Sequence, residues 1–169
     1  MEFRRVVVTG LGLVCPVGLD VETSWKNLLA GVSGVRRITQ FDPTGFPVQI
    51  AAEIEGFDPS PYMDFKMARR SGRFAQIGTA AAQQALCSGG LEIDEANRDD
   101  IGVICASTGG VFVMGKQEEI IEQRGPNRVD PLLIPRLGPH MAAARIGRVL
   151  GVRGPNTTIN SACASGTDA

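Results

Sequence analysis

This sequence has few histidine and aromatic residues, and its positive and negative charges nearly cancel. Its 169 residues include one histidine, and aromatic residues make up 5% of them. The formal net charge is −1, so any cationic binding site must be local rather than spread over the surface. The apolar run at residues 6–8 is too short for a signal peptide or a membrane span. These absences predict a cytoplasmic protein that binds neither nucleic acid nor membrane.

The four cysteines are far apart in the sequence and form no C-x-x-C pair. With one histidine in the chain, a Cys/His zinc site has too few ligands, and we expect neither a metal nor a cofactor. Cys15, Cys87 and Cys105 lie among apolar or small residues, which is typical of buried cysteines. Only Cys163 has flanking residues that favour an exposed thiol.

Apolar strands alternate with amphipathic helices along the chain. Strands are predicted over residues 5–9, 48–54, 101–105 and 157–160. Helices are predicted after Asp20, from about 65 or 70 to 88, over 114–123 and over 140–150. The order predicts an α/β fold with a mainly parallel sheet covered by helices, and the length predicts one domain. In such folds, functional residues gather at the carboxyl ends of the strands.

Cys163 follows the last predicted strand, where a helical turn begins. A helix N-terminus favours negative charge, which suits a thiolate nucleophile. The small neighbouring residues let the backbone turn sharply and leave room for a substrate carbonyl, whose oxygen could accept a hydrogen bond from the backbone N–H of Cys163. A buried structural cysteine in a tight strand–helix junction is the alternative interpretation. The local pattern alone does not decide between the two.

Three longer segments carry a specific resemblance. They are R-R-V-V-V-T-G-L-G-L-V-C-P-V-G near the start, W-K-N-L-L-A-G-V-S-G-V after it, and G-V-R-G-P-N-T-T-I-N-S-A-C-A-S-G-T-D-A at the end. They resemble the first strand and turn, the first helix and the nucleophile elbow of the β-ketoacyl-acyl carrier protein synthases, the elongating type II ketosynthases of fatty-acid synthesis. The resemblance implies a thiolase-like fold. Residues 1–169 would then be an incomplete N-terminal half-domain, part of the first of two duplicated halves.

The resemblance also implies roles for individual residues. Cys163 matches the cysteine that accepts the acyl group from acyl carrier protein, and its backbone N–H matches one donor of the oxyanion hole. Ala162 and Leu133 match positions near the acyl-chain channel, and Leu133 comes from a segment near the family's dimer interface. Thr108 aligns less closely with another channel position. The acyl-enzyme would then condense with malonyl-acyl carrier protein after decarboxylation, which extends the chain by two carbons.

A group of cations supports a carrier-protein partner. Lys66, Arg69, Arg70 and Arg73 follow at i, i+3, i+4 and i+7, on one helical face if the helix begins that early. Such a face suits an acidic partner, although many charge clusters are simply solvated. The resemblance implies that Lys66, Arg69 and Arg70 contact acyl carrier protein, and that Arg128 has a similar role in a loop.

In family members, two histidines, a lysine and a glycine-rich loop follow the nucleophile, whereas this sequence ends at Ala169. His140 precedes Cys163 at the start of a helix and is expected to be structural. The resemblance therefore implies a fragment that cannot complete the condensation alone, and a homodimer in the complete form. Three alternatives stay open: a polyketide-type ketosynthase, a non-catalytic carrier-binding or dimer partner, and a hydrolase that uses Cys163 with His140.

Overall fold

The computed structural model describes residues 4–169, which divide into two compact units. The first unit extends to Asp58 and includes Gln83–Leu91, and the second comprises Pro59–Ala82 and Glu92–Ala169. Helix α3 (Arg73–Gly89) passes from the second unit into the first. None of the helices within residues 4–169 is long and apolar enough to span a membrane.

The first unit contains helix α1 (Val21–Leu29) and a small antiparallel sheet. Asp20 caps α1 as predicted, because its carboxylate accepts a hydrogen bond of 2.7 Å from the backbone N–H of Thr23. Strand β1 (Val35–Arg37) pairs with β2 (Ile50–Ala52), with Arg36 opposite Ala51. Strand β2 lies within the predicted strand at 48–54, which is therefore confirmed in a shorter form.

The predicted strand over residues 5–9 is absent from the structure. This segment joins no ladder, and the side chains of Val6, Val7 and Val8 are 93%, 67% and 81% exposed. A strand needs a neighbour to pair its backbone N–H and C=O groups, and no segment within residues 4–169 supplies one. The apolar pattern is present, but it does not form the expected ladder.

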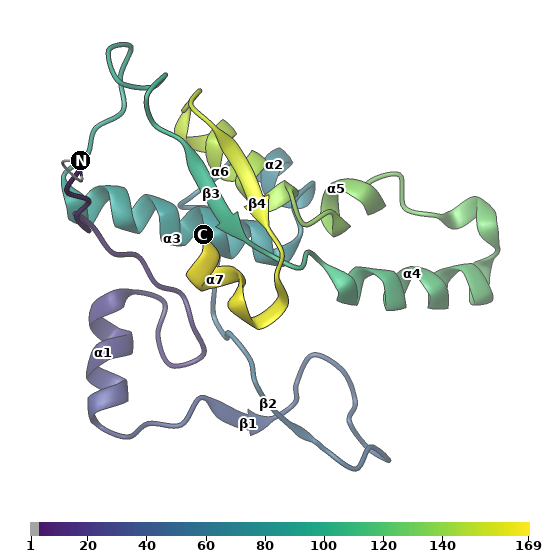
Figure 1. Cartoon of the computed structure of the whole chain (residues 1–169). Coiled ribbons are helices and arrows are strands. Elements are labelled where there is room, and N and C mark those ends of the chain that lie inside the picture. Colours follow the sequence, from purple (N-terminus) through teal and green to yellow (C-terminus); the bar gives the residue numbers. More distant parts are fainter. Residues whose placement is uncertain (1–3) are drawn as a thin grey trace. The chain divides into compact units, whose positions relative to one another are not determined.

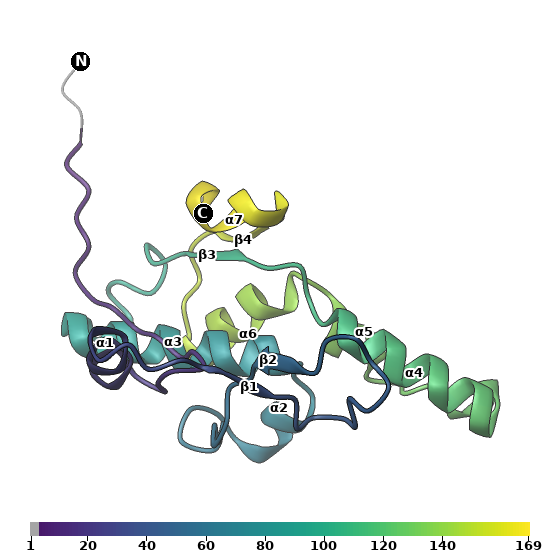
Figure 2. The same ribbon diagram turned by 90° about the horizontal axis from the view of Figure 1, so that it is seen from below.

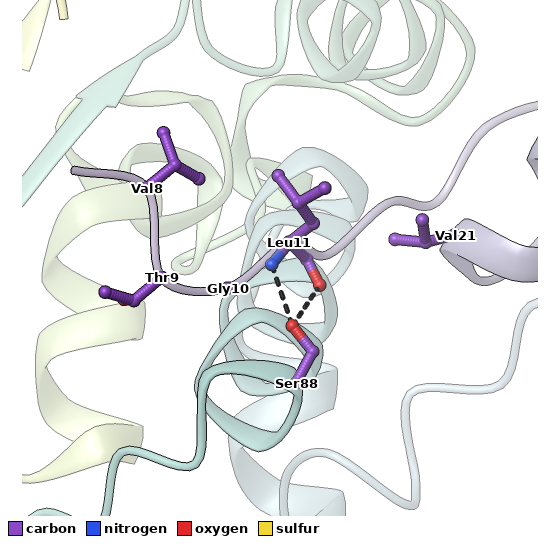
Figure 3. Close-up of a pocket in the computed structure, with 6 residues that line it drawn as sticks. All are labelled: Val8, Thr9, Gly10, Leu11, Val21 and Ser88. Atoms are coloured by element: carbon purple, nitrogen blue, oxygen red, sulfur yellow. Dashed lines mark hydrogen bonds between the residues drawn. The ribbon is translucent and has the colours of Figure 1, made fainter.

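Gly10 and Leu11, which follow this segment, lie against the end of α3 within the same unit (Figure 3). The hydroxyl of Ser88 accepts a hydrogen bond from the backbone N–H of Leu11 and donates one to the Leu11 carbonyl oxygen, at 2.8 and 3.0 Å. A Cβ atom on Gly10 would lie 2.0 Å from the carbonyl oxygen of Ala85, so a larger residue does not fit there. The adjoining cavity of about 360 Å³ is largely apolar and is lined by no titratable side chain among the described residues.

The second unit is built on a parallel pair of strands. Strand β3 (Val103–Ala106) pairs with β4 (Asn156–Ile159), and Ala106 lies opposite Ile159 at the carboxyl end. Helix α6 (Met141–Leu150) packs on this pair, with Ala143 and Ile146 against Val103 in the core. Figure 2 shows α6 on one face of the strands and α7 (Ser165–Asp168) on the other. Helices and mixed strands confirm the predicted α/β class.

The long helix predicted from about 65 or 70 to 88 is two helices in the structure. Helix α2 (Phe65–Arg69) ends before Gly72, and α3 begins at Arg73. At Gly72 the chain passes close to another segment, since a Cβ atom there would lie 2.5 Å from the carbonyl oxygen of Arg136. Lys66, Arg69, Arg70 and Arg73 would share one helical face only if a single helix began near residue 65. That condition is not met, because Arg73 begins a separate helix.

The remaining helices lie in the second unit (Figure 1). They are α4 (Val111–Arg124), the 3₁₀ helix η1 (Pro126–Arg128), α5 (Leu133–Leu137) and the 3₁₀ helix η2 (Ala162–Ala164). The predicted helix at 114–123 is confirmed and is longer at its start. Helix α6 agrees with the prediction at 140–150, and it ends at Gly151, whose φ of +73° is the left-handed conformation expected of a C-terminal glycine.

Candidate active site

The chain turns sharply between strand β4 and Cys163. Ala162 has a φ of +54°, and it is the one non-glycine residue with positive φ among the described residues. This conformation costs about 1–2 kcal/mol for a residue with a Cβ atom. Cys163 follows in η2, and its side chain is exposed. The structure therefore has the predicted turn after a strand, with an accessible thiol on it.

The buried side chain of Ser165 forms hydrogen bonds to the backbone of this turn. Its side chain is 5% exposed, in contrast to the exposed residues on either side. The hydroxyl donates a hydrogen bond of 2.7 Å to the carbonyl oxygen of Ala162 and accepts one of 2.8 Å from the backbone N–H of Ser161. The hydroxyl of Ser161 in turn bonds to the carboxylate of Asp168. These bonds hold the strained turn in one conformation.

Thr108 and Leu133 lie on segments connected to the same edge of the sheet. The backbone N–H of Ser107 bonds to the carbonyl oxygen of Ile159 at 3.2 Å, so the loop with Thr108 leaves β3 where the turn to Cys163 leaves β4. Thr108 is exposed. Leu133 is half-buried at the start of α5, whose last residue bonds to the N–H of Gly110 in that loop.

The predicted docking cations are exposed. Lys66, Arg69 and Arg70 lie on or directly after α2, and Arg128 ends η1. Arg136 donates a hydrogen bond of 2.6 Å to the carbonyl oxygen of Arg69. The end of α2 is therefore tied to the rest of the second unit while its cationic side chains face solvent.

The other cysteines and the histidine differ in their surroundings. Cys105 contacts the core of the second unit, and burial raises the pKa of its thiol. Cys15 is half-buried, but Cys87 is exposed, so the prediction that it is buried is wrong: it lies near the exposed end of α3. His140 is exposed before α6 and makes no capping bond. Within residues 4–169, no cluster of three or more His, Cys, Asp or Glu residues could hold a metal ion.

Sequence reasoning missed Ser165 as the residue that closes the turn. A serine two positions after a candidate nucleophile is a weak signal, because serine is also common in exposed turns. Its role depends on the hydroxyl pointing inward, which the sequence does not reveal. The pair formed by Asp130 and Arg136, at 2.5 Å, was missed for the same reason.

Solved structures of similar fold place the chain in the class of the thiolase-like ketosynthases. The chain is 30% identical to a structure described as the ishigamide ketosynthase/chain length factor, with a TM-score of 0.82 over 94% of this chain and 40% of that one. It is 27% identical to a β-ketoacyl synthase from Burkholderia phymatum, with a TM-score of 0.77 over 99% of this chain and 42% of that one.

Sequence comparison identifies the family. The family model described as "Beta-ketoacyl synthase, N-terminal domain" matches residues 3–169, and the chain belongs to this family. It is 43% identical to the 3-oxoacyl-[acyl-carrier-protein] synthase 2 of Vibrio cholerae and 42% identical to that of Coxiella burnetii, each over 98% of this chain. The chain spans about 40% of the length of these relatives. The expected resemblance to the N-terminal part of such a synthase is confirmed.

Proposed function

We propose that this chain provides the acyl-accepting nucleophile of a 3-oxoacyl-acyl carrier protein synthase that acts in fatty-acid elongation, and that the nucleophile is Cys163. The exposed thiol on a strained turn directly after β4 is the observation that carries the proposal. Strained, over-determined backbone is typical of functional sites. The names of the 3-oxoacyl-acyl carrier protein synthase relatives support the reaction.

In the proposed first step, the thiolate of Cys163 attacks the thioester carbonyl of an acyl carrier protein. A new carbon–sulfur bond forms, negative charge develops on the carbonyl oxygen, and the backbone N–H of Cys163 donates a hydrogen bond to it. The intermediate collapses, the carrier thiolate leaves and takes up a proton, and the acyl group stays on Cys163. Ala162, Leu133 and Thr108 would line the channel for the acyl chain.

In the proposed second step, a malonyl-acyl carrier protein loses carbon dioxide to give a carbanion equivalent. This carbon attacks the acyl thioester on Cys163, and the cysteine thiolate leaves. The product is a β-ketoacyl thioester, longer by two carbons, on the carrier protein. We propose no cofactor for these two steps, because neither of them needs an external oxidant or reductant.

The acyl adduct is the direct test. Full-length protein is incubated with acyl-acyl carrier protein, digested, and analysed by mass spectrometry for acylated cysteine. We expect the adduct on Cys163 and its loss in Cys163→Ala. Cys87→Ser is the matched control, because Cys87 is also exposed but lies far from the turn in sequence. An adduct that survives Cys163→Ala, or that disappears in Cys87→Ser, would contradict the proposal.

We further propose that acyl carrier protein docks on Lys66, Arg69, Arg70 and Arg128. Their exposure supports this, since solvent-facing cations can steer an acidic partner toward the site. The complete protein would act as a cytoplasmic homodimer.

Three alternatives receive less support. A non-catalytic partner is disfavoured by the presence of Cys163, because chain-length-factor relatives replace the nucleophile. A polyketide-type ketosynthase would use the same nucleophile, but the relatives with 42–43% identity are 3-oxoacyl-acyl carrier protein synthases. A hydrolase that uses Cys163 and His140 would release free acid in the adduct experiment, and His140→Ala would abolish that release.

A further inference from the structure

A cluster of three arginines connects the end of α2 to α6. The guanidinium of Arg145, which is half-buried on α6, donates a hydrogen bond of 3.2 Å to the carbonyl oxygen of Arg70, the residue directly after α2. Arg148 follows Arg145 by three residues, so the two lie on neighbouring positions of one face of α6, and Arg148 is exposed. All three arginines belong to the second unit. We call them the α2–α6 arginine cluster.

The positive charges of this cluster are not neutralised by salt bridges. Within residues 4–169, none of its three arginines forms a salt bridge with a carboxylate. Burial lowers the pKa of the Arg145 guanidinium, and the neighbouring positive charges of Arg148 and Arg70 lower it further. An arginine nevertheless stays charged at neutral pH. Like charges this close repel one another, and the repulsion destabilises the folded chain.

Arg136 shows how the end of α2 can be held without an excess of charge. It also donates a hydrogen bond to this end, of 2.6 Å to the carbonyl oxygen of Arg69, but its guanidinium is paired with the carboxylate of Asp130. A structural role at the end of α2 therefore does not require an unpaired cation. The excess charge on Arg145 and Arg148 is better explained by a partner that supplies the carboxylates.

We propose that α6 extends the docking surface for acyl carrier protein beyond α2. The exposed guanidinium of Arg148 binds a carboxylate of the carrier protein, and Arg145 holds the backbone of Arg70 in place and adds to the positive potential there. Two observations select this partner: the cluster needs acidic groups, and it is continuous with Arg70, which belongs to the proposed docking surface. The inference rests on the proposed docking of acyl carrier protein and adds a second helix to it.

The test is kcat/KM of the full-length protein for acyl-acyl carrier protein, measured at several ionic strengths. At low salt, Arg148→Gln should lower kcat/KM by about three- to fivefold, which is the loss of one exposed ion pair. The difference should vanish near about 0.5 M salt, where the Debye length is only about 4 Å. Arg148→Lys keeps the charge and should restore most of the rate. Arg37→Gln is the matched control, because Arg37 is an exposed arginine on β1 in the first unit.

Two further results are expected. Arg37→Gln should change kcat/KM by less than about twofold, since one distant exposed charge is largely screened. A small acyl thioester needs no docking surface, so Arg148→Gln should leave its kcat/KM unchanged. Arg145→Gln should also weaken the use of acyl-acyl carrier protein, and the Arg148 variants still decide the question if Arg145→Gln does not fold.

An unchanged kcat/KM in Arg148→Gln would overturn the proposal, and so would equal losses in Arg148→Gln and Arg37→Gln. A loss that persists at high salt, or that also affects the small thioester, would indicate a structural defect and would overturn it too. The parent proposal fails in a different experiment. If Arg69→Glu combined with Arg70→Glu impairs only the carrier-bound substrate while Arg148→Gln does not, docking at α2 stands and the contribution of α6 is wrong.

Discussion

The hydroxyl of Ser165 donates a hydrogen bond of 2.7 Å to the carbonyl oxygen of Ala162, the residue held at a φ of +54° directly before Cys163. The same hydroxyl accepts the N–H of Ser161. One buried side chain thus satisfies two backbone groups of a strained turn. Ser165 is therefore a positioning residue for Cys163, and it acts through the backbone without touching the substrate.

Ser165→Ala should slow acylation of Cys163 by about tenfold, because the turn loses the bonds that fix the thiol and the adjacent N–H. Alkylation of Cys163 by iodoacetamide needs no oxyanion donor and should change by less than about threefold. Ser165→Thr keeps the hydroxyl and should restore much of the acylation rate. Rapid-quench mass spectrometry measures both reactions. An equal fall in acylation and alkylation would indicate a general structural defect instead.

Arg69→Glu combined with Arg70→Glu should lower kcat/KM for acyl-acyl carrier protein by about tenfold or more, because both exposed cations become anions facing an acidic partner. A small acyl thioester needs no docking surface and should react as before. Lys26→Glu is the control for an added negative charge elsewhere. Equal losses with the carrier-bound and small substrates would argue against docking at this surface.

Replacement of two glycines by alanine should change the free energy of unfolding in opposite directions. Gly115→Ala should raise the free energy of unfolding by about 1 kcal/mol, because Gly115 lies within α4 and its Cβ would meet nothing within 4 Å. Gly72→Ala should lower it by about 1–3 kcal/mol, since the new atom would lie 2.5 Å from the carbonyl oxygen of Arg136. Urea unfolding of the full-length protein measures both. A stabilising Gly72→Ala would show that the α2–α3 junction is looser than described.

Cys105 should be alkylated more slowly than Cys87 at neutral pH, because burial both restricts access and raises the pKa of the Cys105 thiol. The raised pKa also determines how the free energy of unfolding changes with pH. The folded state favours the neutral thiol of Cys105. The contribution of this thiol to the free energy of unfolding is therefore complete below the ordinary pKa of a thiol, and it is lost as pH rises through the higher pKa of the folded state. Cys105→Ala should remove this part of the alkaline decline in stability, measured by urea unfolding between pH 8 and 11.

Local signals predicted much of the secondary structure. The Asp20 cap, the Gly151 C-terminus and the strand before Cys163 each depend on residues close in sequence, and each was found. The strand at residues 5–9 depends on a distant pairing partner, and the break at Gly72 depends on a distant backbone segment. Such features cannot be recognised from a local pattern.

In the candidate site, too, features that depend on neighbouring residues could be predicted and features that depend on distant segments could not. Small residues around Cys163 indicated a turn, and the turn is present. Which loop shares the carboxyl edge of β3 and β4 is a consequence of tertiary packing. The family resemblance named Thr108 and Leu133, but spacing alone would not have linked them to a cysteine so far along the chain.

The bonds that close the turn around Cys163 all join residues between 161 and 168. Closing so short a loop loses little chain entropy and takes well under a microsecond in an unfolded chain. The pairing of β3 with β4, by contrast, joins Ala106 to Ile159 and must wait for a much longer loop to close. The nucleophile turn can therefore form early in folding, before the sheet edge on which it will operate has been assembled.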